Sequence, residues 1–366
     1  MLQTQELHIE GNVPCLEYSD PDQLPHHPVV SIKMLTYNHA PYIGEAIESI
    51  VNQETDFPFE LVIGEDCSPD TTQDIAREYV EKYPDKIRLL TSEANVGICK
   101  NDWRVEVVCR GTYLAYCEGD DYWHDPTKLQ KQVDLLEANP DCVLVHSDVD
   151  FFFQDKGTLV SQQRKKQNRG WPESISPQEL YELFLCGING CYTPSVMVRA
   201  KVLDEVIASD PEVFLEGKFP LGDLPRWMEL AWRGTFLYID ESLATLRRIG
   251  ESATRSANWS SRARFSLGAL RLTLYYNQKY PAAPEKINPQ IKGMGLQALR
   301  QACLGRDADL AREIVETLPS ITRKHRLLQW AAGSCIGNLA FRITNALAIR
   351  LRRLYRKMRY GIESSI

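Results

Sequence analysis

The segment VVSIKMLTYNHAPYIGEAIESIV, residues 29–51, carries the strongest signal for the fold. Its first seven residues are mostly apolar and rich in β-branched side chains, which is typical of a buried strand. The polar turn TYNHAP follows. After the turn, apolar residues recur at the spacing of one helical face, at Ile43, Ala46, Ile47, Ile50 and Val51. This stretch therefore predicts a strand, a loop and a helix that covers one side of a sheet.

The same order of elements recurs along the next seventy residues. Further apolar strands are predicted at FELVIG, IRLL and TYLAYC, and polar loops follow them with the sequences EDCSPDTT, TSEANVG and EGDD. Amphipathic helices separate these strands. Such alternation predicts an α/β fold with a mostly parallel sheet flanked by helices, in which ligands bind beyond the carboxyl ends of the strands. We therefore expect the loops NHAP, EDCSPD and EGDDYW to lie on one rim.

Length and composition suggest one large domain with a helical appendage. The 366 residues include 43% hydrophobic and 25% charged residues, as in ordinary soluble globular proteins. We predict an irregular leader over residues 1–27 and an α/β domain over 28–255. Residues 256–366 read as a helical C-terminal region with a basic tail.

Charge and cysteine usage exclude some classes of protein. A net charge of −7 argues against nucleic acid as a partner. The ten cysteines are scattered without a CxxC pair or zinc-ligand spacing, which fits reduced thiols in the cytoplasm. The first residues lack the basic start and apolar run of a secretory signal. We therefore expect a cytoplasmic protein.

The C-terminal residues raise the question of membrane contact. Residues 327–349 are apolar in patches but are interrupted by polar residues, so a spanning helix is not expected. Between Arg342 and Arg359 there are seven Arg or Lys residues and no acidic residue. A helix of this kind can lie peripherally on an anionic membrane. It can equally pack on the rest of the protein, and both interpretations stay open.

Acidic residues follow two of the predicted strands. The cluster Glu118–Asp121 follows TYLAYC, and Glu65 and Asp66 end FELVIG. Clustered carboxylates at such a place suggest Mg²⁺ or Mn²⁺, held by one or two carboxylates while phosphate oxygens complete the shell. The alternative for the first cluster is an acidic turn before a helix. A carboxylate in the second pair can accept hydrogen bonds from a nucleotide base or ribose.

Together these segments resemble glycosyltransferase family 2, the nucleotide-sugar enzymes of GT-A type, and especially those of bacterial surface polysaccharide assembly. VSIKMLTYNHAPYIGEAIESIVNQ is similar to the opening strand, YN turn and helix of the family, and LVIGEDCSPDTT to its second strand with an acidic loop. YLAYCEGDDYWHDPTKLQKQV resembles the segment with its metal-binding motif. The resemblance covers residues 28–255 and implies a Rossmann-like GT-A fold.

The resemblance implies roles for individual residues in donor binding. Asp66 would contact the base, and Asp120 would face the metal and diphosphate. Asp121 would coordinate through water or orient the donor sugar. Glu118 stands where the family more often has Asp. The nucleotide would be flanked by Thr36, Tyr37 and Asn38.

Two later segments supply further candidates. LGDLPRWMELAWRG has the form of the family's helix after the acceptor loop, which makes Asp223 the candidate catalytic base; the same residue can instead cap the helix. In LATLRRIGES, Arg247 corresponds to the family's arginine near the diphosphate, and a guanidinium can clamp phosphate oxygens. Arg248 competes for that assignment.

These features predict an enzyme that moves a sugar from a nucleoside diphosphate sugar, UDP-linked in our expectation, to a hydroxyl of a saccharide or lipid-linked saccharide. The resemblance adds an inverting, metal-dependent mechanism. One alternative is a sugar-nucleotide nucleotidyltransferase, but its glycine-rich basic loop is missing from MLTYNHAPYIG. Another is a non-catalytic saccharide-binding protein, which would have no use for Asp120, Asp121 and Asp223 together.

Overall fold

The chain divides into two compact units, residues 1–250 and 251–366. The computed structural model describes residues 1–9, 11–162, 175–220, 222–250 and 258–345. The predicted boundary after residue 255 lies outside these residues, and each unit is described by itself.

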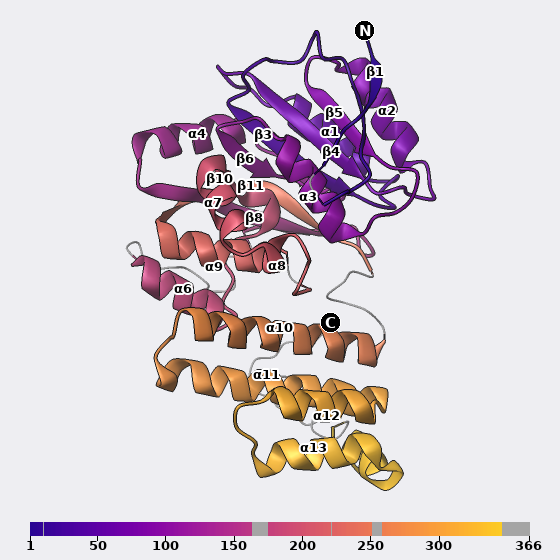
Figure 1. The fold of residues 1–366 in the computed structure, drawn as a ribbon, viewed down its shortest axis with the longest axis vertical. Helices are drawn as coiled ribbons and strands as arrows, with labels where there is room; N and C mark the ends of the chain where they lie inside the picture. The colour runs from indigo at the N-terminus through magenta and orange to yellow at the C-terminus, as the bar shows by residue number, and fades with distance from the viewer. Residues whose placement is uncertain (10, 163–174, 221, 251–257, 346–366) are drawn as a thin grey trace. The chain divides into compact units, whose positions relative to one another are not determined.

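The N-terminal unit is an α/β structure (Figure 1). Its strands are β1 (Gln3–Glu6), β2 (Leu16–Ser19), β3 (Val30–Thr36), β4 (Phe59–Glu65), β5 (Ile87–Thr91), β6 (Tyr113–Tyr116), β7 (Tyr122–Trp123), β8 (Cys142–Phe153), β9 (Thr158–Val160), β10 (Met197–Arg199) and β11 (Thr235–Arg248). Its helices are α1 (Ile43–Val51), α2 (Thr72–Lys82), α3 (Ile98–Val108), α4 (Lys128–Ala138), α6 (Pro177–Leu185), the 3-10 turn η1 (Thr193–Ser195), α7 (Ala200–Ser209), α8 (Pro211–Phe214) and α9 (Asp223–Arg233).

All these strands belong to one sheet, in the order β1-β2-β5-β4-β3-β6-β10-β8-β11-β7, with β9 paired to β8. The pairs β5–β4, β4–β3, β3–β6 and β8–β11 are parallel. Strand β10 is antiparallel to both β6 and β8, so β8 still runs in the direction of β6. The predicted α/β fold with a mostly parallel sheet is confirmed.

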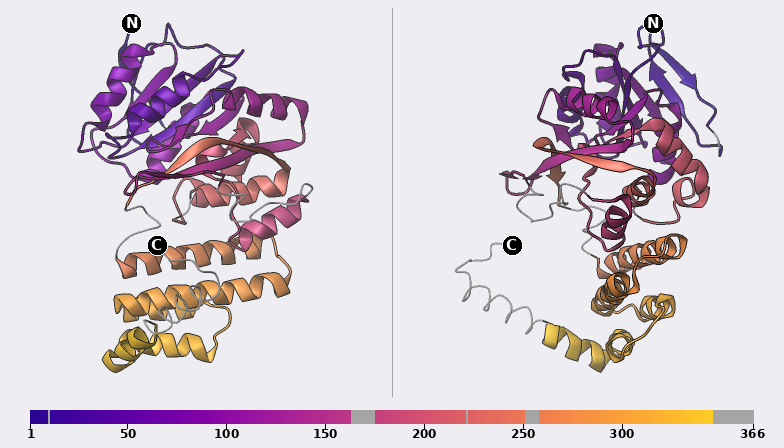
Figure 2. Two further views of the ribbon diagram at one scale, coloured as in Figure 1. Left: turned by 180° about the vertical axis from the view of Figure 1, so that it is seen from behind. Right: turned by 90° about the vertical axis from the view of Figure 1, so that its left-hand side faces the viewer.

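Helices pack on both faces of this sheet (Figure 2). Helix α1 buries the predicted face, from Ile43 to Val51. In β4, Leu61 and Ile63 join the core under α1, α2 and α4, whereas the residue between them, Val62, packs with Val105 of α3 on the opposite face. Successive side chains of a strand point to opposite faces, which explains why both faces of these buried strands carry apolar residues.

The predicted irregular leader is wrong for part of residues 1–27, because β1 and β2 extend the sheet beyond β5. The hydrophobic pattern could not reveal β2, since the residues it buries are polar. Glu17 is one of them, and its carboxylate receives Arg88 Nε at 2.7 Å and Nη2 at 2.9 Å. A buried ion pair thus takes the place of an apolar face.

The C-terminal unit is helical, as predicted. Helices α10 (Trp259–Lys279), α11 (Pro284–Gly305), α12 (Ala308–Thr317) and α13 (Arg323–Gly333) pack against one another, and a further helical stretch covers residues 335–345 (Figure 1). Within the described part of the chain, no helix combines the length and the hydropathy needed to cross a bilayer. The predicted basic tail lies outside the described residues from 346 onward.

One close approach makes the N-terminal sheet sensitive to a single methyl group. A Cβ on Gly64 of β4 would lie 2.4 Å from Val105 Cγ2 and 2.7 Å from Asn101 Oδ1, both on α3. We expect Gly64→Ala to lower the free energy of unfolding by about 1–3 kcal/mol through overpacking. Gly44→Ala is the matched control, because its Cβ would meet only Tyr79 at ordinary contact distance. Urea denaturation of both variants would contradict this account if they were equally stable.

Candidate active site

Three loops meet at the carboxyl edge of β3, β4 and β6. These strands are parallel neighbours, so the loops that follow them come together. Two backbone hydrogen bonds join the loops: Asp66 N–H donates to Thr36 O at 3.2 Å, and Gly119 N–H donates to Leu35 O at 3.0 Å. The rim expected from the sequence therefore exists.

The loop after β3 is held by the loop after β4. Asn38 has a φ of 58°, and its N–H donates to Ser68 Oγ at 3.0 Å. Ala40 N–H donates to Asp70 Oδ2 at 3.2 Å. Tyr37 stays 45% exposed. The backbone of the predicted nucleotide-flanking segment is thus fixed, while the Tyr37 ring is available to a ligand.

Gly119 lets the acidic loop approach the end of β3 closely. A Cβ at this position would lie 2.6 Å from Thr36 Oγ1 and 3.0 Å from His39 Nδ1. Both of these polar atoms are buried and have no hydrogen-bond partner within the described residues. Unpaired buried polar atoms are costly, so two of them beside one loop favour a bound ligand or water there.

The three acids of the loop differ in their hydrogen bonds. Glu118 Oε2 accepts from Leu35 N–H at 3.0 Å, and Asp121 Oδ1 accepts from Arg247 N–H at 2.8 Å. The half-buried Asp120 carboxylate accepts no hydrogen bond from the residues that the structure describes. Asp120 is therefore the carboxylate of this loop that is most open to a cation, and its role as the metal ligand stays a prediction.

Electrostatics at the loop also favour a cation. Burial, reinforced by the negative charge of Asp120, raises the pKa of Glu118 to about 8. The same two causes raise the pKa of Asp121 well above its ordinary value. Positive charge bound beside these carboxylates would stabilise their ionised forms. No group of three or more His, Cys, Asp or Glu side chains within the described ranges forms a metal cage. A cation here would need oxygens from a ligand, such as phosphate.

Asp66 is already engaged within the protein. Its carboxylate accepts from Val96 N–H at 2.8 Å and from Gly97 N–H at 3.0 Å, which are the two residues before α3. The side chain is buried. The predicted base-contact residue therefore also fixes the loop between β5 and α3.

Arg247, the predicted phosphate clamp, holds the acidic loop in place. Its Nε donates to Asp120 O at 2.9 Å and its Nη1 to Gln154 Oε1 at 2.7 Å, while Nη2 pairs with Glu45. Tyr42, Tyr122 and Phe152 also surround the guanidinium, with ring centroids 4.9–5.4 Å away. All three guanidinium nitrogens thus donate to oxygens of the protein.

Asp223 and Glu118 line one pocket of about 240 Å³ in the N-terminal unit. Asp223 is the first residue of α9, and its carboxylate accepts from Leu224 N–H at 2.8 Å. Burial raises the pKa of Asp223, and the Arg226 guanidinium opposes that rise. Apolar walls come from Leu35, Ile98, Val213, Phe214, Phe219 and Trp227. A carboxyl group in such surroundings can exchange a proton nearer neutral pH than an ordinary aspartate.

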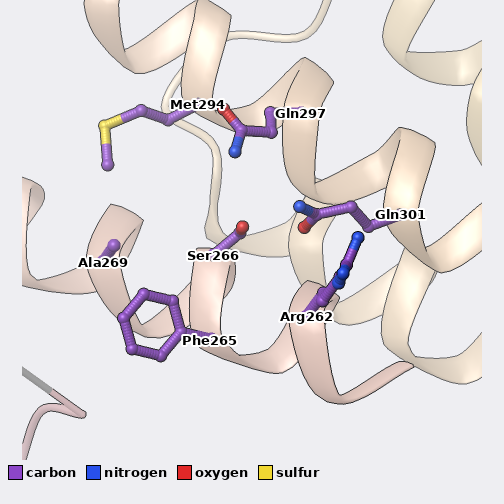
Figure 3. Close-up of a pocket in the computed structure, with 7 residues that line it drawn as sticks. All are labelled: Arg262, Phe265, Ser266, Ala269, Met294, Gln297 and Gln301. Carbon is purple, nitrogen blue, oxygen red and sulfur yellow. The ribbon is translucent and has the colours of Figure 1, made fainter. Parts of the chain in front are cut away.

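A second pocket, of about 330 Å³, lies between α10 and α11 of the C-terminal unit (Figure 3). Its lining comprises Arg262, Phe265, Ser266, Ala269, Met294, Gln297 and Gln301. None of these residues is a carboxylate, and none is among the predicted site residues. We therefore assign the candidate active site to the rim of the sheet.

Sequence reasoning missed a group of charged residues beneath the rim. Asp102 of α3 forms ion pairs with Lys33 of β3 and with Arg226 of α9, and all three side chains are buried or nearly so. The one available signal was Lys33 itself, a charge inside the otherwise apolar run VVSIKML. Its partners come from distant segments and could not be paired by spacing.

The sequence is similar to those of known glycosyltransferases. The model of the family described as Glycosyl transferase family 2 matches residues 31–207. Proteins from Mycobacterium bovis and Mycobacterium tuberculosis are 40% identical over 126 residues, which is 34% of this chain and 36% of theirs. The chain thus matches about a third of the length of these relatives. Bacillus subtilis TuaG, named for teichuronic acid biosynthesis, is 27% identical over 235 residues, covering 64% of this chain and 84% of its own.

Two solved structures share the fold. The Staphylococcus aureus TarS fragment 1–349, in complex with UDP-GlcNAc, superposes with a TM-score of 0.54 at 15% identity, over 84% of this chain and 88% of that one. The mannosyltransferase PcManGT of Pyrobaculum calidifontis, in complex with GDP-Man and Mn²⁺, gives a TM-score of 0.50 at 19% identity, over 91% and 83%. At these identities the likeness concerns the fold alone.

The contacts of Arg247 predict a structural cost for removing it. We expect Arg247→Met to lower the free energy of unfolding by about 2 kcal/mol, because the oxygens of Asp120, Gln154 and Glu45 lose a charged donor. Arg77→Met is the matched control, since that guanidinium lies 5.0 Å from the centroid of the Tyr18 ring and its loss should cost less. Equal losses in urea denaturation would show that Arg247 does not hold the loop.

Proposed function

Because the chain belongs to glycosyltransferase family 2, we propose that it transfers a sugar from a nucleoside diphosphate sugar to a hydroxyl group of a saccharide or lipid-linked saccharide. The observation that carries this proposal is the pocket shared by Asp223 and the acidic loop. It brings the half-buried carboxyl group of Asp223, which can act as a base, together with Glu118 of the acidic loop, and the Asp120 carboxylate of the same loop is open to a cation.

The nucleotide would lie across the loops after β3 and β4. Thr36, Tyr37 and Asn38 would flank it, with the exposed Tyr37 ring available for stacking. Asp66 would contact the base while it keeps at least one of its hydrogen bonds to Val96 and Gly97, because a carboxylate has lone pairs for more than two donors.

Asp120 would hold Mn²⁺ or Mg²⁺ together with the diphosphate of the donor. The open carboxylate and the shortage of other protein ligands fit a hard cation that shares its shell with phosphate. When bound, such an ion offsets the charge that develops on the departing nucleotide. Asp121, tied to the Arg247 backbone, would orient the donor sugar.

Asp223 would act as the catalytic base. In its ionised form it would take the proton from an acceptor hydroxyl while that oxygen attacks the anomeric carbon. Direct attack of this kind breaks the bond to the diphosphate on the opposite face and inverts the configuration. The raised pKa brings Asp223 nearer to neutrality, which suits a general base. Activity should therefore rise with pH as Asp223 loses its proton.

Arg247 would act on the donor through the acidic loop. Its bonds to Asp120 O and Asp121 Oδ1 set the position of both residues. Direct contact with phosphate would require the guanidinium to exchange one of its protein partners. We therefore propose that Arg247 positions the metal-binding loop, and that its predicted contact with the diphosphate is secondary.

The names of similar proteins support the choice of substrates. TuaG is named for teichuronic acid biosynthesis, and TarS was solved with UDP-GlcNAc. We accordingly propose a UDP-sugar as donor and a cell-surface polysaccharide or its precursor as product. PcManGT was solved with Mn²⁺, which supports a divalent metal.

The donor site can be tested by thermal-shift measurements with UDP-GlcNAc and with GDP-mannose, each with and without Mn²⁺. A donor present at roughly 100 times its Kd should add about 3 kcal/mol of stability. We expect a shift that depends on Mn²⁺ and is larger for the UDP-sugar. Asp120→Asn should lose the dependence on metal, whereas Asp223→Asn should keep donor binding and lose sugar transfer.

Asp155→Asn serves as the matched control, since this carboxylate is exposed on the turn after β8. It should leave both binding and transfer unchanged. An Asp223→Asn enzyme with full activity would exclude Asp223 as the base. The absence of any shift with either donor would count against a nucleotide-sugar site.

Peripheral membrane contact would bring the enzyme to a lipid-linked acceptor at the cytoplasmic face. Exposed apolar side chains support this part of the proposal. On α13 they are Leu327 and Trp330, and on the following helical stretch they are Ile336, Leu339 and Ile343. The basic run to Arg359 continues directly from this stretch. Apolar and basic side chains together are what an anionic lipid surface binds.

Vesicle sedimentation tests this contact. Truncation after Ala340 removes the basic run and should lower binding to phosphatidylserine-containing vesicles at least about tenfold, because each Lys or Arg contributes about 1 kcal/mol near such a surface. Trp330→Ser should also weaken binding, whereas Leu159→Ser, an exposed apolar residue of the other unit, should not. Unchanged binding after truncation would exclude the basic run as the contact.

A further inference from the structure

Four charged side chains form a buried cluster beneath the pocket, and no role has yet been assigned to it. They are Lys33 of β3, Asp102 and Glu106 of α3, and Arg226 of α9. Lys33 Nζ lies 2.7 Å from Asp102 Oδ1 and also pairs with Glu106. Arg226 Nη2 pairs with Asp102 Oδ2 and lies 3.8 Å from Glu106 Oε2. The cluster joins three elements that are distant in sequence.

Such a cluster is a costly way to fill a core. The side chains of Lys33, Glu106 and Arg226 are only 2%, 4% and 7% exposed. Removing charges from water costs several kcal/mol per ion, and apolar residues of similar volume are often as stable or more so. What paired charges add is a defined geometry, since each hydrogen bond fixes direction as well as distance.

The cluster is linked by a hydrogen bond to Gly222, the residue before Asp223. Arg226 Nη1 donates to the carbonyl oxygen of Gly222 at 2.7 Å, while Nη2 of the same guanidinium bonds to Asp102. Because the guanidinium is planar and rigid, the Gly222 carbonyl and the Asp102 carboxylate are fixed relative to each other. The start of α9 is thereby tied to the middle of α3.

Helix α3 also begins at the donor side of the site. Val96 and Gly97, the two residues before it, donate to the Asp66 carboxylate. One rigid helix thus carries both the loop held by Asp66 and the carboxylate that pairs with Arg226. Asp102, Arg226 and Asp223 all line the same pocket.

We propose that the Arg226–Asp102 ion pair is a positioning device that holds the base Asp223 at a fixed place relative to the donor site. The proposal rests on the proposed function, because it assigns to Asp223 the role of base. Lys33 supports the pair by keeping Asp102 charged and oriented, and Glu106 in turn pairs with Lys33. Arg226 and Asp102 are therefore positioning residues and need not touch the substrate.

The charges around Asp223 provide a readout that packing alone would not move. The charged and titratable groups that line the pocket with Asp223 come from three elements. They are Arg226 of α9, Asp102 and Cys99 of α3, Tyr116 of β6, and Glu118 in the loop after β6. Removing the positive Arg226 should make Asp223 harder to ionise, and removing the negative Asp102 should make it easier. The acidic limb of the pH–rate profile should consequently move in opposite directions in the two variants.

The experiment compares Arg226→Met, Arg226→Lys and Asp102→Asn in the full-length protein. The readout is the release of UDP from UDP-GlcNAc in the presence of Mn²⁺ and an acceptor. We expect kcat to fall on the order of 100-fold in Arg226→Met, as displacement of a catalytic group by about 1 Å can cause, while the donor KM stays near its original value. Arg226→Lys should recover part of the loss. The acidic limb should shift by about one unit upward in Arg226→Met and downward in Asp102→Asn.

Arg88→Met is the matched control. Arg88 is an equally buried arginine that pairs with Glu17 in the same unit but does not line the pocket. It should lose stability without a change in kcat or in the pH profile. Equal kcat values in Arg226→Met and Arg88→Met, or acidic limbs that shift in the same direction in Arg226→Met and Asp102→Asn, would overturn the proposal.

A measurement without substrate separates this inference from the proposed function. Amide hydrogen exchange over residues 222–228 should be faster in Arg226→Met and in Asp102→Asn than in the unaltered protein, and unchanged in Arg88→Met. If the unaltered protein releases no UDP, the proposed function fails, while the exchange rates still decide whether the pair holds the Asp223 segment. Unchanged exchange in both pocket variants would refute the positioning role.

Discussion

Parallel pairing of β4, β3 and β6 is the constraint on which the site depends. It brings three loops, the first and last of which are more than eighty residues apart in sequence, to one edge of the sheet. Gly119 has no side chain, so its backbone can lie directly against the side chain of Thr36, and two of these loops come together there. Each of these apolar strands is followed by a polar loop, and the residues proposed to bind the donor lie in or beside these loops. A Rossmann-like sheet achieves this arrangement through its topology alone.

Many polar groups of the site already form hydrogen bonds within the protein before any ligand binds. Asp66 bonds to the loop before α3, and Arg247 bonds to the acidic loop, so two residues expected to meet the donor also maintain the shape of the site. Such dual use limits reorganisation on binding, because the groups are already oriented. Asp120 differs, since its carboxylate has no partner in the described part of the chain. The contrast separates residues that shape the site from the one that is open to a ligand.

The sequence was informative where periodicity and position carry the signal. The face of α1, the strands β3, β4 and β6 and the start of α9 at Asp223 all followed from local patterns. Features that depend on pairing between distant polar residues were not predictable in this way. Strand β2 buries Glu17 against Arg88, and the cluster around Lys33 uses partners from α3 and α9, so neither leaves an apolar period. Likewise, the engagement of Arg247 with Glu45 depends on tertiary packing that spacing cannot reveal.

The N-terminal strands also have a consequence for the behaviour of the protein in solution. Without β2, strand β5 would form the edge of the sheet and present unpaired N–H and C=O groups, which readily recruit a strand from another molecule. With β1 and β2 in place, the outermost strand is QTQE, four residues long and polar throughout. Short polar edges are poor templates for further pairing. Strands β1 and β2 should therefore reduce edge-to-edge aggregation, a role separate from the chemistry proposed for the loops after β3, β4 and β6.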